Sequence, residues 1–510
     1  MKKISRRSFL KSSAMASIAT AAVPLISRSL AGSGAAKTTG YFENEFGIND
    51  LLCQKVLTKA LSRGGDFADL FFEHSIGNWV DLEDGKVNQA YSVIQLGVGI
   101  RTVKGDQVGY GFTQILNEKS MLDAAATAAT IASGTAKKPA DKFIRQEIKN
   151  YYSSKRLLTS VPLESKLPLV QAANDRCFAL SPLIIKVSAG FHDRQKRILV
   201  VSSDGIKTED LIPKNYLYAS VVAEKNGKRE RSSWNLGGRH DFSYYTMDLV
   251  KEICKTAVDR TLVLFDAVPA PAGEMPVVLG PGIPAILLHE AIGHGMEADF
   301  NRKKISTYTT MIGKKVAEPF VTIIDDGTNP KLLGALNVDD EGTPGQKTIL
   351  VENGILTSYM HDKISARHYQ VKPTGNGRRQ SYEHYVVPRM RNTYMLAGPS
   401  TSEEIIKSVK KGIYVKGVSN GQVKIGEGDF AFYVSQGLMI ENGKLTAPIK
   451  DMNIMGNGPK MLKNVTMVAN DLEMSKGGTG YCGKDGQRVP VGFGMPTVLV
   501  KSLTVGGRKA

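Results

Sequence analysis

The chain has 510 residues, of which 42% are hydrophobic and 23% are charged, an ordinary composition for a globular protein. This length exceeds what one hydrophobic core usually serves, so two or three domains are expected. The net charge is +17, but no run of five like charges, helix-turn-helix or zinc-finger pattern occurs, which argues against nucleic acid as a partner. After residue 36 no apolar run of about 18 residues occurs, so no transmembrane segment is expected in the mature chain.

The first 36 residues have the features of a twin-arginine signal peptide. Arg6 and Arg7 precede Phe-Leu-Lys, and a mildly apolar stretch rich in Ala and Ser runs from Ser12 to Ile26. Small residues follow, as a signal peptidase requires. Removing the six basic residues of this segment lowers the net charge from +17 to +11. We therefore expect export by the twin-arginine route to a periplasmic or extracytoplasmic location; a basic tail without this role is the alternative.

Residues 37–140 are expected to form an amino-terminal α+β domain. Apolar residues recur at helical spacing over residues 49–61 and again over residues 120–132. Between these stretches apolar and polar residues alternate, which is typical of strands. The strands are expected at residues 67–75, 79–82, 94–103 and 107–113.

Residues 141–267 are expected to form a middle domain. One helix is predicted over residues 165–179, with Pro168 in its first turn, where proline is tolerated. A Pro-rich joint follows at residues 268–273. Strands are expected before it, at residues 184–192, 197–203 and 216–224.

Residues 268–510 are expected to form a β-rich domain of mostly antiparallel strands with one helix, which makes the chain α+β overall. Asn353-Gly354 and Asn442-Gly443 tolerate the positive φ angles of a tight turn, so each pair predicts a β-hairpin. The strands are expected at residues 275–279, 321–325, 348–352, 354–360 and 412–418.

The single helix expected in this domain carries a histidine pair. Pro284 suits a first helical turn, and His289, Glu290 and His294 follow. In His-Glu-x-x-His peptidase helices the two imidazoles share one face, but a spacing of five residues separates them by about 140° on an ideal helix. We expect a π-type bulge or an early helix end at Gly293 to bring both rings to one metal. Two unrelated core histidines are the alternative.

Several longer motifs accompany this helix in a fixed order. They are AIGHGMEADFNR (291–302), IDDGT (324–328), DDEGTPGQ (339–346), PTGNGRR (373–379), CGKDGQ (482–487), PVG (490–492) and LTVGG (503–507). This series resembles the TldD/PmbA family of metallopeptidases. The resemblance is strong from about residue 281 to residue 507 and weaker from residue 67 to residue 111.

The resemblance implies one Zn²⁺ per chain, bound by His289, His294 and Cys482, with Glu290 as the general base. Two imidazoles and a thiolate are good zinc donors and leave a fourth position for water, although such a set also suits other divalent ions. The implied activity is hydrolysis of peptide bonds in extended or unfolded polypeptides, with the substrate bound as a β-strand. A non-catalytic peptide-binding or assembly subunit is the alternative function.

Other polar residues near these motifs have open assignments. Glu297 orients an imidazole from behind, is an alternative ligand, or is a plain surface charge. Arg378 and Arg379 are candidates to bind a substrate backbone or carboxylate through forked hydrogen bonds, and a solvated loop is their alternative. Gly478–Lys484 matches GxxxxGK, but Asp485 replaces the required Ser or Thr, so no phosphate loop is expected.

Four cysteines lie far apart in the sequence. In an exported protein we expect Cys53, Cys177 and Cys254 in disulfides or as buried thiols. A disulfide is also the alternative for Cys482. The resemblance further implies a dimer, either a homodimer or a heterodimer with a metal-less PmbA-like relative. Because this chain has every motif residue, we expect it to be the active subunit.

Overall fold

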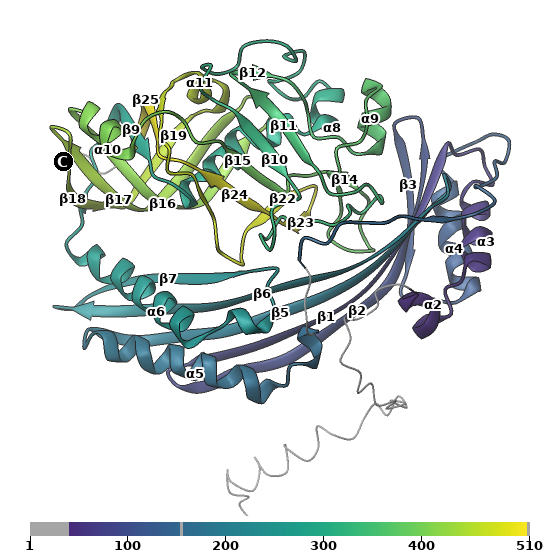
Figure 1. Ribbon diagram of the computed structural model, residues 1–510, viewed down its shortest axis with the longest axis horizontal. Coiled ribbons are helices and arrows are strands. Elements are labelled where there is room, and N and C mark those ends of the chain that lie inside the picture. The colour runs from purple at the N-terminus through teal and green to yellow at the C-terminus, as the bar shows by residue number, and fades with distance from the viewer. Residues whose placement is uncertain (1–39, 153–156, 507–510) are drawn as a thin grey trace, which may run out of the picture. The chain divides into compact units, whose positions relative to one another are not determined.

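The computed structural model describes residues 40–152 and 157–506 (Figure 1). For Asn420 it describes the backbone alone. The expected signal peptide, residues 1–36, lies outside the described residues. Within the described residues no helix is both long and apolar enough to cross a membrane.

One seven-stranded sheet contains all strands before residue 240 in the described chain. Its order is β3-β2-β1-β5-β6-β4, and β7 also pairs with β6. β1 and β5 are antiparallel neighbours from Asp69↔Ser202 to Glu83↔Ser188, so segments 37–140 and 141–267 share this sheet. The strands are β1 (Phe67–Glu83), β2 (Lys86–Lys104), β3 (Gln107–Thr113), β4 (Ile144–Arg145), β5 (Ile184–Ser202), β6 (Ile206–Lys225) and β7 (Lys228–Gly238).

Strands that the sequence predicts as short pieces are continuous in the structure. β1 and β5 both run through polar stretches where the apolar alternation fails. In these stretches polar side chains of the two strands form hydrogen bonds with each other. Asn78 of β1 donates to Asp193 of β5 (2.8 Å), and Arg194 of β5 donates to Ser75 of β1 (2.8 Å). Paired polar side chains therefore sustain the strands where hydrophobic alternation does not.

Helices cover one face of this sheet (Figure 1). α3 and α4 pack on β1, β2 and β3, while α5 packs mainly on β5, and α6 on β6 and β7. α5 begins at Leu163, earlier than expected, so Pro168 lies inside the helix rather than in its first turn. The sequence analysis did not predict α6. The helices before residue 270 are α2 (Tyr41–Phe46), α3 (Asp50–Ala60), α4 (Glu118–Ala129), α5 (Leu163–Leu180) and α6 (Met247–Leu262), with short 3₁₀ turns η1 (Leu158–Ser160), η2 (Phe242–Tyr244) and η3 (Val263–Phe265).

The opposite face of the sheet packs against the carboxy-terminal half. Leu70 and Phe72 of β1 face the helices, whereas Phe71 between them joins a cluster with Ala335 and Tyr382. Side chains of a strand alternate between its faces, so the first residues of β1 are buried on both sides of the sheet.

The carboxy-terminal half is built around a closed ring of strands. β16 pairs with both β9 and β17, which closes the circuit β16-β9-β25-β19-β17. β8, β18 and β20 extend this sheet. The strands are β8 (Val268–Pro269), β9 (Gly273–Leu279), β16 (Lys411–Lys424), β17 (Asp429–Glu441), β18 (Lys444–Lys450), β19 (Met452–Asn457), β20 (Val465–Val468) and β25 (Val498–Gly506).

A second, six-stranded sheet and two hairpins complete this half. The sheet order is β12-β11-β10-β15-β24-β21. Its strands are β10 (Ile323–Asp326), β11 (Lys347–Glu352), β12 (Ile355–Leu356), β15 (Asn392–Met395), β21 (Glu473–Met474) and β24 (Gly492–Met495). The hairpins are β13 (Gly377–Arg378) with β14 (Val387–Pro388), and β22 (Tyr481–Lys484) with β23 (Gln487–Pro490).

Most strand pairs here are antiparallel, and the predicted α+β fold is confirmed. Both Asn-Gly hairpins are confirmed too: Asn353 and Asn442 have φ angles of 49° and 50°. The expectation of a single helix in this half was wrong. α9 (Lys363–Tyr369), α10 (Ser402–Ser408) and α11 (Gly458–Lys463) are also present. They are too short to show a hydrophobic period, and each begins at a side-chain cap.

Candidate metal centre

His289 and His294 lie on a helix whose geometry changes along its length. The elements are η4 (Ile283–Ala285), α7 (Ile286–Leu288), η5 (His289–Gly293), η6 (His294–Met296) and α8 (Ala298–Arg302). η5 is a π-turn, in which the His294 N–H donates to the His289 carbonyl. An i→i+5 bond is the mark of a π-helix, and it brings the two rings to 5.2 Å between centroids. The predicted π-type bulge is confirmed.

Gly293 has a different role from the one the sequence suggested. Its φ of −59° and ψ of −50° are ordinary helical values, so no special conformational freedom is used. A Cβ at this position would lie 2.1 Å from Met390 Sδ. Glycine is needed here because a buried methionine from another part of the chain packs directly against the helix backbone.

Cys482 on β22 completes a cluster of three donors. Its Sγ lies 3.4 Å from His294 Nε2, and the donor atoms of Cys482, His289 and His294 all lie within 4.8 Å of one another. All three residues are buried, and neither ring nitrogen of His289 has a hydrogen-bond partner among the described residues. Buried polar atoms are normally paired, so the free imidazole and the adjacent thiol fit a divalent metal ion.

The electrostatics of the cluster favour a thiolate. Burial disfavours the charged form of Cys482, but His294, His289 and Arg389 outweigh it and hold the thiol pKa well below its ordinary value. Burial likewise opposes a charged His294, but Cys482 and Glu297 outweigh it and hold the imidazole pKa well above its ordinary value. Thiolate is the form that binds metals, and metal binding would displace the proton from His294.

Glu297 lies behind His294, on the side away from Cys482. Its Oε2 is 2.9 Å from His294 Nδ1, while His294 Nε2 faces the cysteine. Lys484 donates to the same Glu297 oxygen (3.1 Å) and to Asp299 (2.6 Å). Burial opposes ionisation of Glu297, but Lys484 and His294 lower its pKa below the ordinary value. The carboxylate thus fixes which nitrogen of His294 points at the donor cluster.

Glu290 is the partly open member of the group. Its side chain is 20% exposed, and its Oε2 lies 3.6 Å from His294 Nε2. The residue occupies the π-turn next to His289. A carboxylate beside the metal donors and open to solvent can exchange protons with water and with a bound ligand.

The sequence analysis assigned neither Lys484 nor Arg389 to the metal centre. Lys484 follows Cys482 by two positions on β22, so both side chains lie on the same face of the strand; this period of two was a usable signal. Arg389 is fully buried and donates to the Cys482 carbonyl. No pattern in the sequence indicated that contact. β22 continues into the hairpin with β23, without the helix that a phosphate loop requires.

Arg378 and Arg379 lie next to each other but make different contacts. Arg378 donates to the carbonyls of Met390 (2.6 Å) and Pro490 (2.7 Å). Arg379 contacts Asp69 of β1 (3.3 Å) and the Asp340 carbonyl (3.0 Å). Both residues are buried. Their guanidinium groups fix loops of the carboxy-terminal half and the sheet, and their predicted contact with substrate stays a prediction.

All four cysteines have free thiols, and all are buried. Cys177 and Cys254 lie in the core between α5 and α6, where Cys254 donates to the Ala173 carbonyl (3.3 Å). The alternative of buried thiols therefore describes this structure for Cys53, Cys177 and Cys254.

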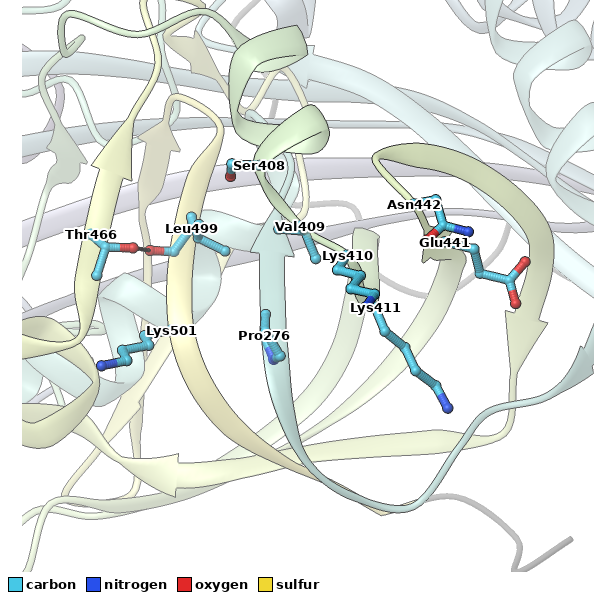
Figure 2. A pocket seen from close by; sticks show the side chains of 10 residues that line it. All are labelled: Pro276, Ser408, Val409, Lys410, Lys411, Glu441, Asn442, Thr466, Leu499 and Lys501. Carbon is cyan, nitrogen blue, oxygen red and sulfur yellow. Dashed lines mark hydrogen bonds between the residues drawn. The ribbon is translucent and has the colours of Figure 1, made fainter.

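A wide groove on the carboxy-terminal half lies apart from these residues (Figure 2). Lys410, Lys411 and Lys501 line it together with Glu441, and its volume is about 850 Å³. None of the predicted site residues lines this groove. Its lysines are exposed to solvent. The candidate metal-binding groups lie instead at the donor cluster.

Family models match nearly the whole described chain. PmbA/TldA metallopeptidase domain 1 matches residues 68–132, the central domain matches residues 156–265, and the C-terminal domain matches residues 272–507. The last range includes every residue of the donor cluster.

Several curated relatives have metalloprotease names. The chain is 41% identical over 468 residues to "Metalloprotease TldD homolog" of Buchnera aphidicola subsp. Acyrthosiphon pisum, which covers 90% of this chain and 96% of the relative. The protein of the same name from Haemophilus influenzae is 42% identical over 454 residues, with 87% and 94% covered. "Zinc metalloprotease TldD homolog" of Saccharolobus solfataricus is 27% identical over 471 residues, with 89% and 99% covered.

Solved structures share the fold. TldE from Thermococcus kodakarensis matches with a TM-score of 0.70 at 18% identity, covering 87% of this chain and 97% of that one. A putative modulator of a DNA gyrase from Thermotoga maritima matches with a TM-score of 0.70 at 22% identity, covering 86% and 96%. Identities this low support the fold, whereas the two bacterial relatives above 40% establish kinship. The chain belongs to the TldD/PmbA family of metallopeptidases.

Proposed function

We propose that this chain is a zinc-dependent peptidase in which His289, His294 and Cys482 hold the metal and Glu290 is the general base. The observation that carries the proposal is the convergence of three donor atoms within 4.8 Å, with Glu290 Oε2 3.6 Å from one of them. Zinc favours this N₂S donor set, and three protein ligands leave a position for water or substrate, as catalytic zinc sites do.

The chain's own residues have separable tasks in this reaction. When bound, zinc would act as a Lewis acid and lower the pKa of water. Glu290 accepts a proton from the attacking water and passes it to the departing amine. Glu297 and Lys484 hold His294 in one orientation, because their buried hydrogen bonds fix its Nδ1. Burial of the donors excludes competing water from the side away from Glu290.

An extended peptide is the substrate we infer. A cleft of about 690 Å³ is lined by residues of β7, of β16 and of the segment leading into η4. Its wall includes Ser233–Leu236 of β7, and among the described strands β7 pairs only with β6. An edge strand offers free backbone hydrogen-bonding groups to an added strand. This recognition mode suits unfolded polypeptides of varied sequence.

A dimer, either with a second copy or with a metal-less PmbA-like relative, is also part of the proposal. β3 pairs only with Val98–Lys104 of β2, so the first half of β2 is an edge within the described chain. Val87, Tyr91 and Ile94 of this stretch are exposed. Long exposed edges with apolar side chains are usually covered in native proteins, which supports a partner at this edge.

Export completes the proposal, with residues 1–36 as a twin-arginine signal and the periplasm as the destination. Replacing Arg6 and Arg7 by lysine should leave the protein in the cytoplasm. Cell fractionation checks this, and unchanged periplasmic recovery would contradict it.

Hydrolysis of unfolded casein by the mature chain tests the proposal. Wild type and Glu290→Ala should each contain about one zinc per chain, with cleavage lost only in the variant. Glu352→Ala, on the exposed β11–β12 hairpin, is the matched control and should cleave like wild type. Zinc-loaded wild type that binds casein without cleaving it would favour the non-catalytic subunit instead.

A further inference from the structure

A small cationic cavity lies between the seven-stranded sheet and the hairpin β22–β23. Its volume is about 90 Å³, and seven lysine and arginine side chains line it against one carboxylate, Asp340. A water molecule takes up about 30 Å³ in the liquid, so the cavity has room for one small polar group rather than a whole ligand. Its charge is far from balanced.

Three of these cations lie side by side on neighbouring strands, two of them in mid-strand and one just after a strand end. Arg194 of β5 is directly opposite Lys214 of β6. Arg239 follows the end of β7, next to the pair Asn215↔Gly238. Like charges directly opposite each other on a sheet destabilise it. An anion shared among them would relieve this repulsion.

The acids near the cavity balance only part of this charge. Glu73 contacts Lys196 (3.1 Å) and Arg194 (3.3 Å), and Asp69 contacts Arg379. Among the described residues no carboxylate forms an ion pair with the remaining cations of the lining. They are Lys214, Arg239, Arg378 and Arg488.

Neither Arg239 nor Lys214 forms an ion pair with a carboxylate among the described residues. Arg239 is 3% exposed and donates to the Pro213 carbonyl (3.1 Å), but its Nε has no partner among the described residues. The Lys214 ammonium contacts the Tyr481 hydroxyl and lies 3.9 Å from that ring's centroid. Burial, together with Arg194, Arg239 and Arg488, lowers the pKa of Lys214 to about 7. An unpaired buried N–H and a destabilised ammonium are the groups that an anion would satisfy.

The cavity lies on the reverse face of the strand that carries Cys482. Cys482 and Lys484 are buried on one face of β22, so Tyr481 points to the other. Arg488 of β23 is opposite Gly483 and lies on that same outer face. Tyr481 and Arg488 line both this cavity and the long cleft beside β7. The cavity and the cleft therefore adjoin at these two residues, so a ligand in the cleft can reach the cavity.

We infer that the cavity binds one carboxylate of the peptide held in the cleft, either its terminal carboxylate or an acidic side chain. The inference rests on the proposed peptidase function for the identity of the ligand. Lys214, Arg239 and Arg488 surround the carboxylate with charge-assisted hydrogen bonds. The substrate class narrows accordingly to peptides that present a negative charge at a fixed distance from the cleaved bond.

Binding of one unfolded nonapeptide in three forms tests the inference. The forms are the free acid without acidic side chains, its carboxamide, and the carboxamide with one glutamate near the end. Calorimetry uses the zinc-loaded mature chain with Glu290→Gln, so that no peptide is consumed. At least one acidic form should bind about tenfold or more tightly than the neutral carboxamide, as a charge-assisted contact implies. Which acidic form gains affinity distinguishes a terminal carboxylate from a side chain.

Lys214→Met, added to the same background, should reduce this preference to about twofold or less while the neutral peptide binds as before. Lys251→Met, on the exposed side of α6, is the control and should keep the preference. Equal affinity for all three forms, or no binding of any, overturns the inference. So does inorganic phosphate that binds through Lys214 without any peptide preference. Casein cleavage by wild type is measured in parallel, and its absence would contradict the peptidase proposal while the binding comparison still decides the inference.

Discussion

His294 of the donor cluster contacts a neighbour through each of its ring nitrogens. Its Nε2 lies 3.4 Å from the Cys482 sulfur, and its Nδ1 lies 2.9 Å from Glu297. Lys484 in turn neutralises Glu297 in a site that is almost fully buried. Without the lysine, a buried carboxylate next to a thiolate would be costly. The ammonium therefore allows two negative groups to flank one imidazole.

Glu297→Gln should weaken zinc binding about 10-fold to 100-fold, because the amide holds His294 less firmly and adds no charge. Competition with a chromophoric chelator measures the affinity. Glu352→Gln on the exposed hairpin is the control and should bind zinc as wild type does. Unchanged zinc affinity in Glu297→Gln would mean that Glu297 does not orient His294.

Asp339 gives the stability a pH dependence. Burial, together with the Glu341 carboxylate, raises the pKa of Asp339 to about 7, above the value of about 3.9 in unfolded chains. Between these pH values the folded chain holds an extra proton, so this contribution to the free energy of unfolding declines as pH rises. Asp339→Asn should therefore cost more stability at pH 5 than at pH 8. Urea unfolding checks this, with exposed Asp106→Asn as the control; an equal cost at both pH values would contradict it.

At the scale of elements, the π-turn is what makes the histidine spacing work. Met390 packs directly against the backbone of this turn at Gly293, where a side chain would not fit. Gly293→Ala should destabilise the fold by about 1–3 kcal/mol through overpacking. Gly293→Ala combined with Met390→Ala should cost less than the sum of the single changes, because the new methyl group enters the space left by the methionine. Additive losses in denaturant unfolding would show that the contact is not the constraint.

The sequence was sufficient for features that depend on local chemistry. The Asn-Gly turns follow from backbone preference, and the bulge between His289 and His294 follows from the need to align two rings. Gly293 marked the right position for the wrong reason, because its contact with Met390 joins residues far apart in the chain. Arg389 and the length of β1 also depend on tertiary partners. Periodicity within one segment contains no information about them.

At the scale of the molecule, buried ion pairs join the sheet to the carboxy-terminal half. Arg101 of β2 donates to Asp69 of β1 and to Glu341 (2.7 Å), and all three side chains are fully buried. Arg379 reaches the same Asp69. The loops that carry the family motifs are thus fixed on the sheet by charge as well as by apolar packing.

Arg101→Met should destabilise the protein by about 3–5 kcal/mol, because it leaves the buried Glu341 without an ionic partner and Asp69 with Arg379 alone. Lys104→Met is the control, since its ion pair with Asp66 is exposed and should contribute no more than about 1 kcal/mol. Denaturant unfolding compares the two. A loss for Arg101→Met no larger than for Lys104→Met would mean that the junction does not depend on this network.

X-ray absorption at the metal edge tests the central claim most directly. For the mature wild-type chain we predict zinc bound by one sulfur at about 2.3 Å and two imidazole nitrogens at about 2.0–2.1 Å. The sulfur signal should vanish in Cys482→Ser. The control is Cys53→Ser, which replaces a buried cysteine of α3 and should keep the signal. A wild-type chain that binds no zinc, or binds it without a sulfur ligand, would contradict the site described for His289, His294 and Cys482.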